Sequence, residues 1–435
     1  MIRRFLIFLT TVFLLAASLW AQQLSPFISY VAIGDSLTAG FINGSLNEKG
    51  QSAAYPVLLS AQMRTFVFLP LVASPGIPNE IELISATFPP VIRLKPGVSA
   101  GRTFPLLMPT NLAVPGHTAD DALRRRPKLP IVPDQTILTN LILGLPGLVV
   151  PIAPTGSQVE LAEFLRPTFV TIWLGNNEIL GPATAGNGNA VPFEQFRAAF
   201  GEIINRISAT GAKMAVANVA DVASAALFLT VPDIAGATGA PPALLQAALG
   251  VGPNDLILAT GLASVAQILR GQARGPLAPE LVLTDDEVKK LRATTKQYND
   301  YIAQLGADKG FPVVDFNTLG QSIRRSGITV GNLRLTGLPL GGIYSLDLIH
   351  PTRTGQAVIA NAFITAINAF YKTNLPPVDV AAIAATDNLV FHSKVESPSQ
   401  ELTLEDLQML AATFGAEPEA GFIDWTQFLS LPKID

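Results

Sequence analysis

The sequence predicts an α/β fold built around a parallel β-sheet. Short apolar stretches, each long enough for one buried strand, alternate along the chain with segments of helical periodicity. This alternation is typical of parallel sheets, in which a helix carries the chain back across the sheet before the next strand begins. At 435 residues, the chain is long enough to bury a large core.

Five stretches are the predicted strands. The clearest is Phe169 to Leu174, because aromatic and β-branched residues favour a strand and Gly175 then favours a turn. The first strand ends at Gly34. The five strands are expected at residues 28–33, at a stretch ending near 111–114, and at 169–174, 213–219 and 312–316.

Two helices have well-defined ends. Thr284 and Glu287 form a capping box, in which each side chain accepts a backbone N–H at the start of the helix. Apolar residues then recur at helical spacing until Gly306, where we expect the helix to stop. The second helix is the largely apolar stretch from Thr354 to Tyr371, which is suited to lie against the sheet.

Three segments interrupt the alternation. Residues 66–105, rich in proline and valine, are expected to form an extended insertion, and residues 224–279 a helical one. A C-terminal extension, 376–435, starts at two consecutive prolines and contains a helix capped near Thr403 and Asp406. With about 60 residues, the extension is expected to pack on the main domain, 22–375, rather than to fold alone.

Composition excludes several classes of protein. The chain has no cysteine, which rules out disulfides, thiolate nucleophiles and cysteine-based metal sites. The net charge is −4 and no basic stripe is present, so nucleic acid is not an expected partner. Hydrophobic residues make up 49%, charged residues 14%, and the mean hydropathy is +0.39. Even so, no internal apolar run reaches the ~20 residues that span a bilayer.

The N-terminus has the layout of a secretory signal peptide, residues 1–21. Arg3 and Arg4 precede an apolar run from Phe5 to Ala17, and small residues follow at the expected cleavage site. The alternative is an uncleaved membrane anchor, for which the run is short. We therefore expect an exported protein, periplasmic or secreted, without a stable membrane span after cleavage.

Ser36 is the candidate nucleophile. It lies in Gly-Asp-Ser-Leu, residues 34–37, where the first strand ends at the carboxyl edge of the sheet, the edge at which open α/β folds bind ligands. A serine hydroxyl attacks only when a base removes its proton and fixed donors hold the developing oxyanion. The structural alternative is an ordinary helix N-cap, for which an Asp-Ser pair is equally suited.

His350 is the candidate base, one of three histidines in the chain. Asp347 precedes it by three residues, so a helical turn or tight loop can bring the carboxylate to the imidazole Nδ1–H. That contact fixes the tautomer and stabilises the imidazolium that forms when His350 accepts a proton. Alternatively, Asp-x-x-His arose by chance in a surface loop.

Together these motifs resemble the GDSL (SGNH-hydrolase) family, whose four blocks have Ser, Gly, Asn and His as key residues. The second block is matched by residues 111–116, ending at Gly116, and the third by 175–178. The chain has Glu178 where the family pattern Gly-x-Asn-Asp ends in Asp, a departure that we assign to loop packing rather than to the chemistry. The resemblance covers most of residues 28–372.

The resemblance implies a fold, an activity and a set of roles. The expected fold is a three-layer α/β/α, flavodoxin-like arrangement with a five-stranded parallel sheet. Ser36 would attack a carboxylic ester, His350 would act as base and then acid, and Asp347 would orient His350. The oxyanion would be held by the N–H groups of Ser36 and Gly116 and by the Asn177 amide. No cofactor or metal is implied.

Motifs of other enzyme classes are absent from the sequence, and the remaining histidines and charged residues have structural explanations. No Gly-x-Ser-x-Gly elbow occurs, and the histidines lack a zinc-binding spacing. His117 either lines the pocket or borders a loop. His392, in the extension, is interpreted as a surface residue, and Asp221 as a structural one. Arg124, Arg125 and Arg126 are expected to close a helix that acidic residues open, which suits the helix dipole.

The substrate is left open among several ester classes. Apolar segments at 66–72, 141–154 and 227–231 form either a rim that admits acyl chains or the buried core of the insertions. The expected partner is a small-molecule or lipid-like ester. The alternatives are an acetylated polysaccharide or a thioester on the same triad, and a non-catalytic envelope binding protein that keeps the fold.

Overall fold

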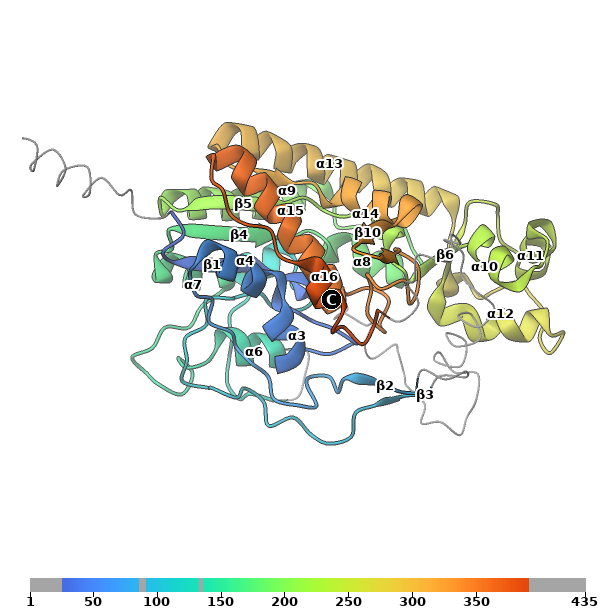
Figure 1. Ribbon diagram of the computed structural model, residues 1–435, viewed down its shortest axis with the longest axis horizontal. Helices are drawn as coiled ribbons and strands as arrows, with labels where there is room; N and C mark the ends of the chain where they lie inside the picture. The colour runs from blue at the N-terminus through green and yellow to red at the C-terminus, as the bar shows by residue number, and fades with distance from the viewer. Residues whose placement is uncertain (1–25, 86–90, 133–135, 391–435) are drawn as a thin grey trace, which may run out of the picture.

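The computed structural model describes residues 26–85, 91–132 and 136–390. Its central sheet contains four parallel strands in the order β1-β4-β5-β9 (Figure 1). The strands are β1 (Tyr30–Gly34), β4 (Phe169–Trp173), β5 (Lys213–Ala217) and β9 (Val313–Val314). The predicted parallel α/β class is therefore confirmed.

The strand count differs from the prediction of five. The stretch expected as the second strand, near 111–114, does lie alongside β1, but it makes only an isolated parallel bridge from Asn111 to Ala32. The Asn111 side chain accepts the N–H of Ala113, which bends the backbone locally. Prolines at 109 and 115, which have no N–H, bound the stretch, so the pairing with β1 stays too short to form a strand.

Helices cover both faces of the sheet, and the strand residues are therefore buried on both sides. Alternate β1 residues, Tyr30 and Ala32, pack with α4 (Tyr55–Met63) and α15 (Arg353–Tyr371). The intervening Val31 and Ile33 pack in the cluster on the other face. That face is covered by α5 (Ala119–Arg124), α7 (Gln158–Leu165), α9 (Phe193–Ala209) and α13 (Asp285–Lys309).

The two predicted helices are present, with one changed boundary. α13 begins at the Thr284–Glu287 capping box, as predicted, but continues past Gly306 and stops at Gly310, whose φ is 75°. A Cβ on Gly306 would lie 2.8 Å from the Val313 side chain. This glycine therefore serves close packing of the helix on β9 and does not end the helix.

The insertions contain more strand than the sequence indicated. Residues 66–105 include an antiparallel hairpin of β2 (Ile81–Ser85) and β3 (Val91–Leu94). The segment expected to be helical, 224–279, also supplies β6 (Phe228–Thr230) and β7 (Leu256–Leu258), which pair with β8 (Val282–Leu283). Figure 1 shows β6 beside the helices α10 (Val231–Thr238), α11 (Pro242–Leu249) and α12 (Leu262–Leu269) at one end of the molecule.

The described part of the C-terminal extension packs on α15. Asp387 accepts the backbone N–H and the hydroxyl of Thr354, each at 2.8 Å, and α16 (Val380–Ala384) contacts the same helix. The predicted signal peptide and the predicted helix near Thr403 lie outside the described residues. Within the described ranges, no helix has the length and apolar character to cross a bilayer.

Candidate active site

Ser36 lies at the turn that follows β1. It opens α2 (Ser36–Ala39), a one-turn helix whose N-cap, Asp35, accepts the N–H of Leu37 at 3.0 Å. A Cβ at Gly34 would lie 2.2 Å from the Thr38 hydroxyl oxygen, so only glycine fits there. These short-range requirements give a tight strand-to-helix turn that presents Ser36 at the carboxyl edge of the sheet.

The structure brings Ser36 and His350 into contact, although 314 positions separate them. The Ser36 Oγ lies 2.8 Å from Nε2 of His350, and Nδ1 of His350 lies 3.1 Å from Oδ2 of Asp347. Leu348, between the last two residues, has a φ of 63°, in the left-handed region. The loop thus turns tightly enough for Asp347 to bond the ring three residues later.

Asp347 is buried and surrounded by donors. Its Oδ2 accepts the N–H of Gly44 at 2.7 Å, and its Oδ1 accepts the N–H groups of Ile349 and His350 at 3.0 and 2.8 Å. Burial alone would raise the pKa of Asp347, but the His350 ring and these donors lower it below its ordinary value. With this carboxylate ionised, Nδ1 of His350 is the donor, which leaves Nε2 to accept the Ser36 proton.

Asn177 opens α8 (Asn177–Thr184) directly after the β4 exit. Its side-chain Nδ2 donates to the backbone oxygen of His117 at 2.9 Å, which fixes the orientation of the amide and leaves its second N–H available. Gly116, with a φ of 81°, immediately precedes His117. In the described part of the chain, the backbone N–H groups of Ser36 and Gly116 have no protein acceptor, as oxyanion donors require.

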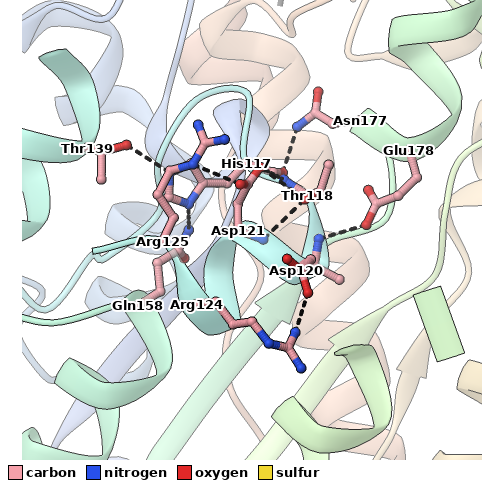
Figure 2. A network of polar contacts seen from close by, with 11 residues as sticks. His117, Thr118, Asp120, Asp121, Arg124, Arg125, Thr139, Gln158, Asn177 and Glu178 are labelled. Atoms are coloured by element: carbon pink, nitrogen blue, oxygen red, sulfur yellow. Dashed lines mark hydrogen bonds and ion pairs between the residues drawn. The ribbon is translucent and has the colours of Figure 1, made fainter. Parts of the chain in front are cut away.

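A buried network around His117, whose contacts with Gln158 and Thr139 are drawn in Figure 2, holds the loop that contains Gly116 to Gly34, at the end of β1. The Gln158 amide pairs with both the N–H and the C=O of Gly34, at 2.9 and 3.0 Å, and its Nε2 donates to Nδ1 of His117 at 3.1 Å. Nε2 of His117 therefore carries the ring proton and lies 2.9 Å from the Thr139 hydroxyl. The sequence did not indicate Gln158, since its partners lie far away along the chain.

His117 is fully engaged in this network. It is 1% exposed, and burial lowers its pKa to about 3, so the ring is neutral near pH 7. Both ring nitrogens have protein partners, which leaves neither for substrate. The sequence allowed His117 either to line the pocket or to border a loop, and the geometry favours the second interpretation.

Glu178, the departure from the family pattern, faces the same loop. Its Oε1 accepts the N–H of Ala119 at 2.7 Å, at the first residue of α5 (Figure 2). Its Oε2 has no partner among the described residues, and burial raises the pKa of Glu178 to about 8. Glu178 therefore stays protonated at neutral pH and joins the β4 exit to the start of α5.

Asn176 makes a second connection between strand ends that the sequence did not indicate. Its Nδ2 donates to Oδ2 of Asp35 at 3.0 Å, and its Oδ1 accepts the N–H of Ala220, after β5, at 3.3 Å. Burial raises the pKa of Asp35 to about 6, although the Asn176 bond partly offsets this. The ends of β1, β4 and β5 are thus fixed to one another beside Ser36.

The remaining candidates have structural partners. Asp221 bonds the guanidinium of Arg292 at 3.0 Å and is not a partner of His350. The three consecutive arginines each pair with a carboxylate: Arg124 with Asp120 and Glu202, Arg125 with Asp121, and Arg126 with Glu160. His392 lies outside the described residues. Among the residues that the structure places, no His, Asp and Glu cluster is suited to a metal ion.

A cavity of about 130 Å³ opens beside Ser36 and Asn177. Its walls come from α8, α15, the loop before His350 and α14 (Phe316–Ser326). None of the three apolar segments that could have formed a rim, at 66–72, 141–154 and 227–231, contributes to it. Residues 227–231 are instead largely buried within the insertion, and Phe66 is 80% exposed elsewhere.

A parallel α/β sheet with a serine, a histidine and an aspartate in hydrogen-bond contact at its carboxyl edge is the arrangement that serine hydrolases use. The sequence matches the family described as GDSL-like Lipase/Acylhydrolase over residues 30–363, and the chain belongs to that family. It is therefore a carboxylic ester hydrolase. No curated protein sequence matches the chain.

The chain is also similar to several solved structures. LAE5, an alpha/beta hydrolase enzyme from the metagenome of Lake Arreo, Spain, is 14% identical over 80% of this chain and 99% of its own, with a TM-score of 0.34. The psychrotrophic esterase EstA from Pseudoalteromonas sp. is 12% identical over 79% of this chain and 100% of its own, with a TM-score of 0.33. At such identities and TM-scores, the likeness says nothing about the substrate.

Proposed function

We propose that this protein is an exported serine esterase that cleaves carboxylic esters through an acyl-enzyme on Ser36. The observation that carries the proposal is the continuous contact from the Ser36 hydroxyl through His350 to Asp347. A hydroxyl 2.8 Å from an imidazole nitrogen, whose other nitrogen bonds a buried carboxylate, can lose its proton as it attacks a carbonyl carbon.

In the first half of the reaction, the Ser36 oxygen bonds to the carbonyl carbon while His350 takes the hydroxyl proton. The carbonyl oxygen becomes an oxyanion, which the N–H groups of Ser36 and Gly116 and the Asn177 amide would hold. The tetrahedral intermediate then expels the alcohol, which takes the proton back from His350. In the second half, water follows the same route, releases the acid and restores Ser36.

The protonation states of the buried groups around the site support these roles. Asp347 is the carboxylate that contacts the imidazole, and its lowered pKa keeps it charged. Glu178 is protonated near pH 7, and His117 is neutral, so both can hold loops without adding charge to the oxyanion site. Charge is thus concentrated where the developing imidazolium needs it.

Hydrolysis of p-nitrophenyl butyrate by purified protein tests the proposal. Ser36→Ala should lower kcat by at least about 10⁴-fold, because the nucleophile is lost while the fold remains. A phosphonate inhibitor should add one phosphonyl group to the peptide that contains Ser36, as seen by mass spectrometry. Well-folded wild-type protein that neither hydrolyses esters nor reacts with the phosphonate would instead indicate the non-catalytic binding protein.

Export is part of the proposal and has its own support. Two arginines, a short apolar run and small residues precede residue 22. When the full chain is expressed in a bacterium, we expect active protein outside the cytoplasm with a new N-terminus close to residue 22. Protein that stays in the membrane fraction with residues 1–21 attached would indicate the anchor instead.

A further inference from the structure

The cavity beside Ser36 has an almost wholly apolar far wall. Ser36 and Asn177 line its reactive end, and the cavity then extends between α14 and α15. The side chains that line this extension are those of Phe316, Leu319, Ile323, Val358 and Ile359. A chain of methylene groups can lose its hydration against such a wall without leaving any polar group unpaired.

The polar groups in the wall are already bonded to the protein. Asp221 holds Arg292, and the Tyr344 hydroxyl donates to the backbone oxygen of Ser224 at 3.2 Å. Asn176 bonds Asp35. Sugar hydroxyls would therefore enter a space with few free partners, and unpaired buried hydroxyls are costly.

The size of the cavity limits the length of the group that fits. A cavity of about 130 Å³ is close to the ~150 Å³ apolar cavity that accommodates benzene, a molecule of six carbons. An acetyl group, with a single methyl beyond the carbonyl, would leave most of this space empty.

We propose that this cavity binds the acyl chain of the substrate and that the enzyme prefers unbranched acyl groups of about six carbons. The inference rests on the proposed function, since Ser36 must be the acylated residue. The acyl part is assigned to the cavity because it stays bonded to Ser36 until water attacks, whereas the alcohol must leave first. An apolar space beside Ser36 suits the group that stays.

The first experiment is a chain-length series of p-nitrophenyl esters from acetate to dodecanoate. Burial of each added methylene should raise kcat/KM about fourfold up to about six carbons, after which the rate should fall. A second series keeps butyrate and lengthens the alcohol, where we expect less than about a twofold change per methylene. A maximum at acetate, or a steep rise only in the alcohol series, would overturn the assignment.

Two variants that change the cavity in opposite directions test its location. Gly320→Leu should fill the far end and move the optimum to two to four carbons, because Gly320 lines the cavity and a Cβ there meets Ser224 only at 3.5 Å. Ile323→Ala should move the optimum about two carbons longer. The control, Ser322→Leu, adds the same side chain to an exposed position of the same helix and should leave the profile unchanged.

These outcomes separate the acyl pocket from the reaction itself. If Ile323→Ala keeps the wild-type profile, or if Gly320→Leu behaves like Ser322→Leu, the pocket assignment is wrong while Ser36 can still be the nucleophile. If wild-type protein hydrolyses no ester of any length and Ser36 resists phosphonate, the proposed function fails first. Should Gly320→Leu not fold, Ile323→Ala alone decides the location.

Discussion

In the proposed mechanism, the Asn177 amide is an oxyanion donor that is oriented before substrate binds. One N–H of its amide is already held by the backbone oxygen of His117, so the other has a fixed direction before substrate arrives. A donor that needs no reorganisation stabilises charge in the transition state more than in the ground state. Its contribution should therefore appear in kcat rather than in KM.

Replacing Asn177 by alanine tests this directly. We expect Asn177→Ala to lower kcat about 10²- to 10³-fold with little change in KM, because only the transition-state bond to the oxyanion is lost. Asn205→Ala, at an exposed position of α9, is the matched control and should keep the wild-type kcat. A rise in KM at constant kcat would show that Asn177 binds substrate uniformly and is not an oxyanion donor.

Residues in motifs that resemble a known family could be predicted as candidates, and residues outside such motifs could not. Ser36, Asp347 and His350 stand in short motifs that match blocks of the family pattern, although Ser36 and His350 lie 314 positions apart. Gln158 has no such motif, since it pairs with Gly34 from 124 positions away. Asn176 bonds Asp35 from 141 positions away, and nothing local distinguishes it from an ordinary loop asparagine.

At the scale of elements, local capping decides where helices begin. Thr284 accepts the N–H of Glu287 at 3.3 Å, and Glu287 accepts the N–H of Thr284 at 2.9 Å. Both groups lie within four residues, so the start of α13 could be predicted. Its end could not, because Gly306 serves a tertiary contact with β9.

The value of this cap can be measured. Thr284→Ala should lower the free energy of unfolding by about 0.5–2 kcal/mol, since a backbone N–H of the first turn loses its acceptor. Thr294→Ala, in the middle of the same helix, should be neutral or slightly stabilising, because alanine has the higher helix propensity. Equal losses in urea unfolding for both variants would show that the cap adds nothing.

The stretch near residues 111–114, which the sequence predicted as a strand, shows where local patterns fail. Its hydrophobic residues predicted a strand, and the stretch does hydrogen-bond with β1: the N–H of Leu112 donates to the oxygen of Ala32 at 2.9 Å. The side chain of Asn111 and the flanking prolines shorten the pairing to a bridge. An extended segment can thus be predicted from the sequence even when the extent of its pairing cannot.

At the scale of the whole molecule, the cavity depends on how distant elements meet. Its walls join α8, α14, α15 and the loop before His350, and the residues that line it run from Asp35 to Ile359. Composition showed that the chain is apolar but not which apolar residues surround Ser36. The segment 227–231 satisfied the same pattern and went into the insertion core instead.

Buried titratable groups make the stability of the whole molecule depend on pH. Glu178 keeps its proton up to a pKa of about 8 when folded, against 4.5 in its ordinary state. Between these values the unfolded chain binds fewer protons, so the free energy of unfolding falls as pH rises. His117, lowered to about 3 from 6.5, acts in the opposite direction, and Asp35, raised to about 6 from 3.8, acts in the same direction as Glu178.

From about pH 7 to 8 the slope is dominated by Glu178, because the upper midpoints of the other two transitions, about 6.5 for unfolded His117 and about 6 for folded Asp35, lie below this window. There the wild-type protein should lose up to about 1.4 kcal/mol of unfolding free energy per pH unit, the value for one proton. Glu178→Gln should remove most of this slope, since glutamine does not ionise.

The comparison uses slopes from urea unfolding because glutamine also buries a new N–H donor beside the start of α5, which shifts the stability at every pH alike. Glu194→Gln, at an exposed position of α9, should keep the wild-type slope. An unchanged slope in Glu178→Gln would mean that Glu178 is ionised in the folded protein, and the neutral link between the β4 exit and α5 would then be wrong.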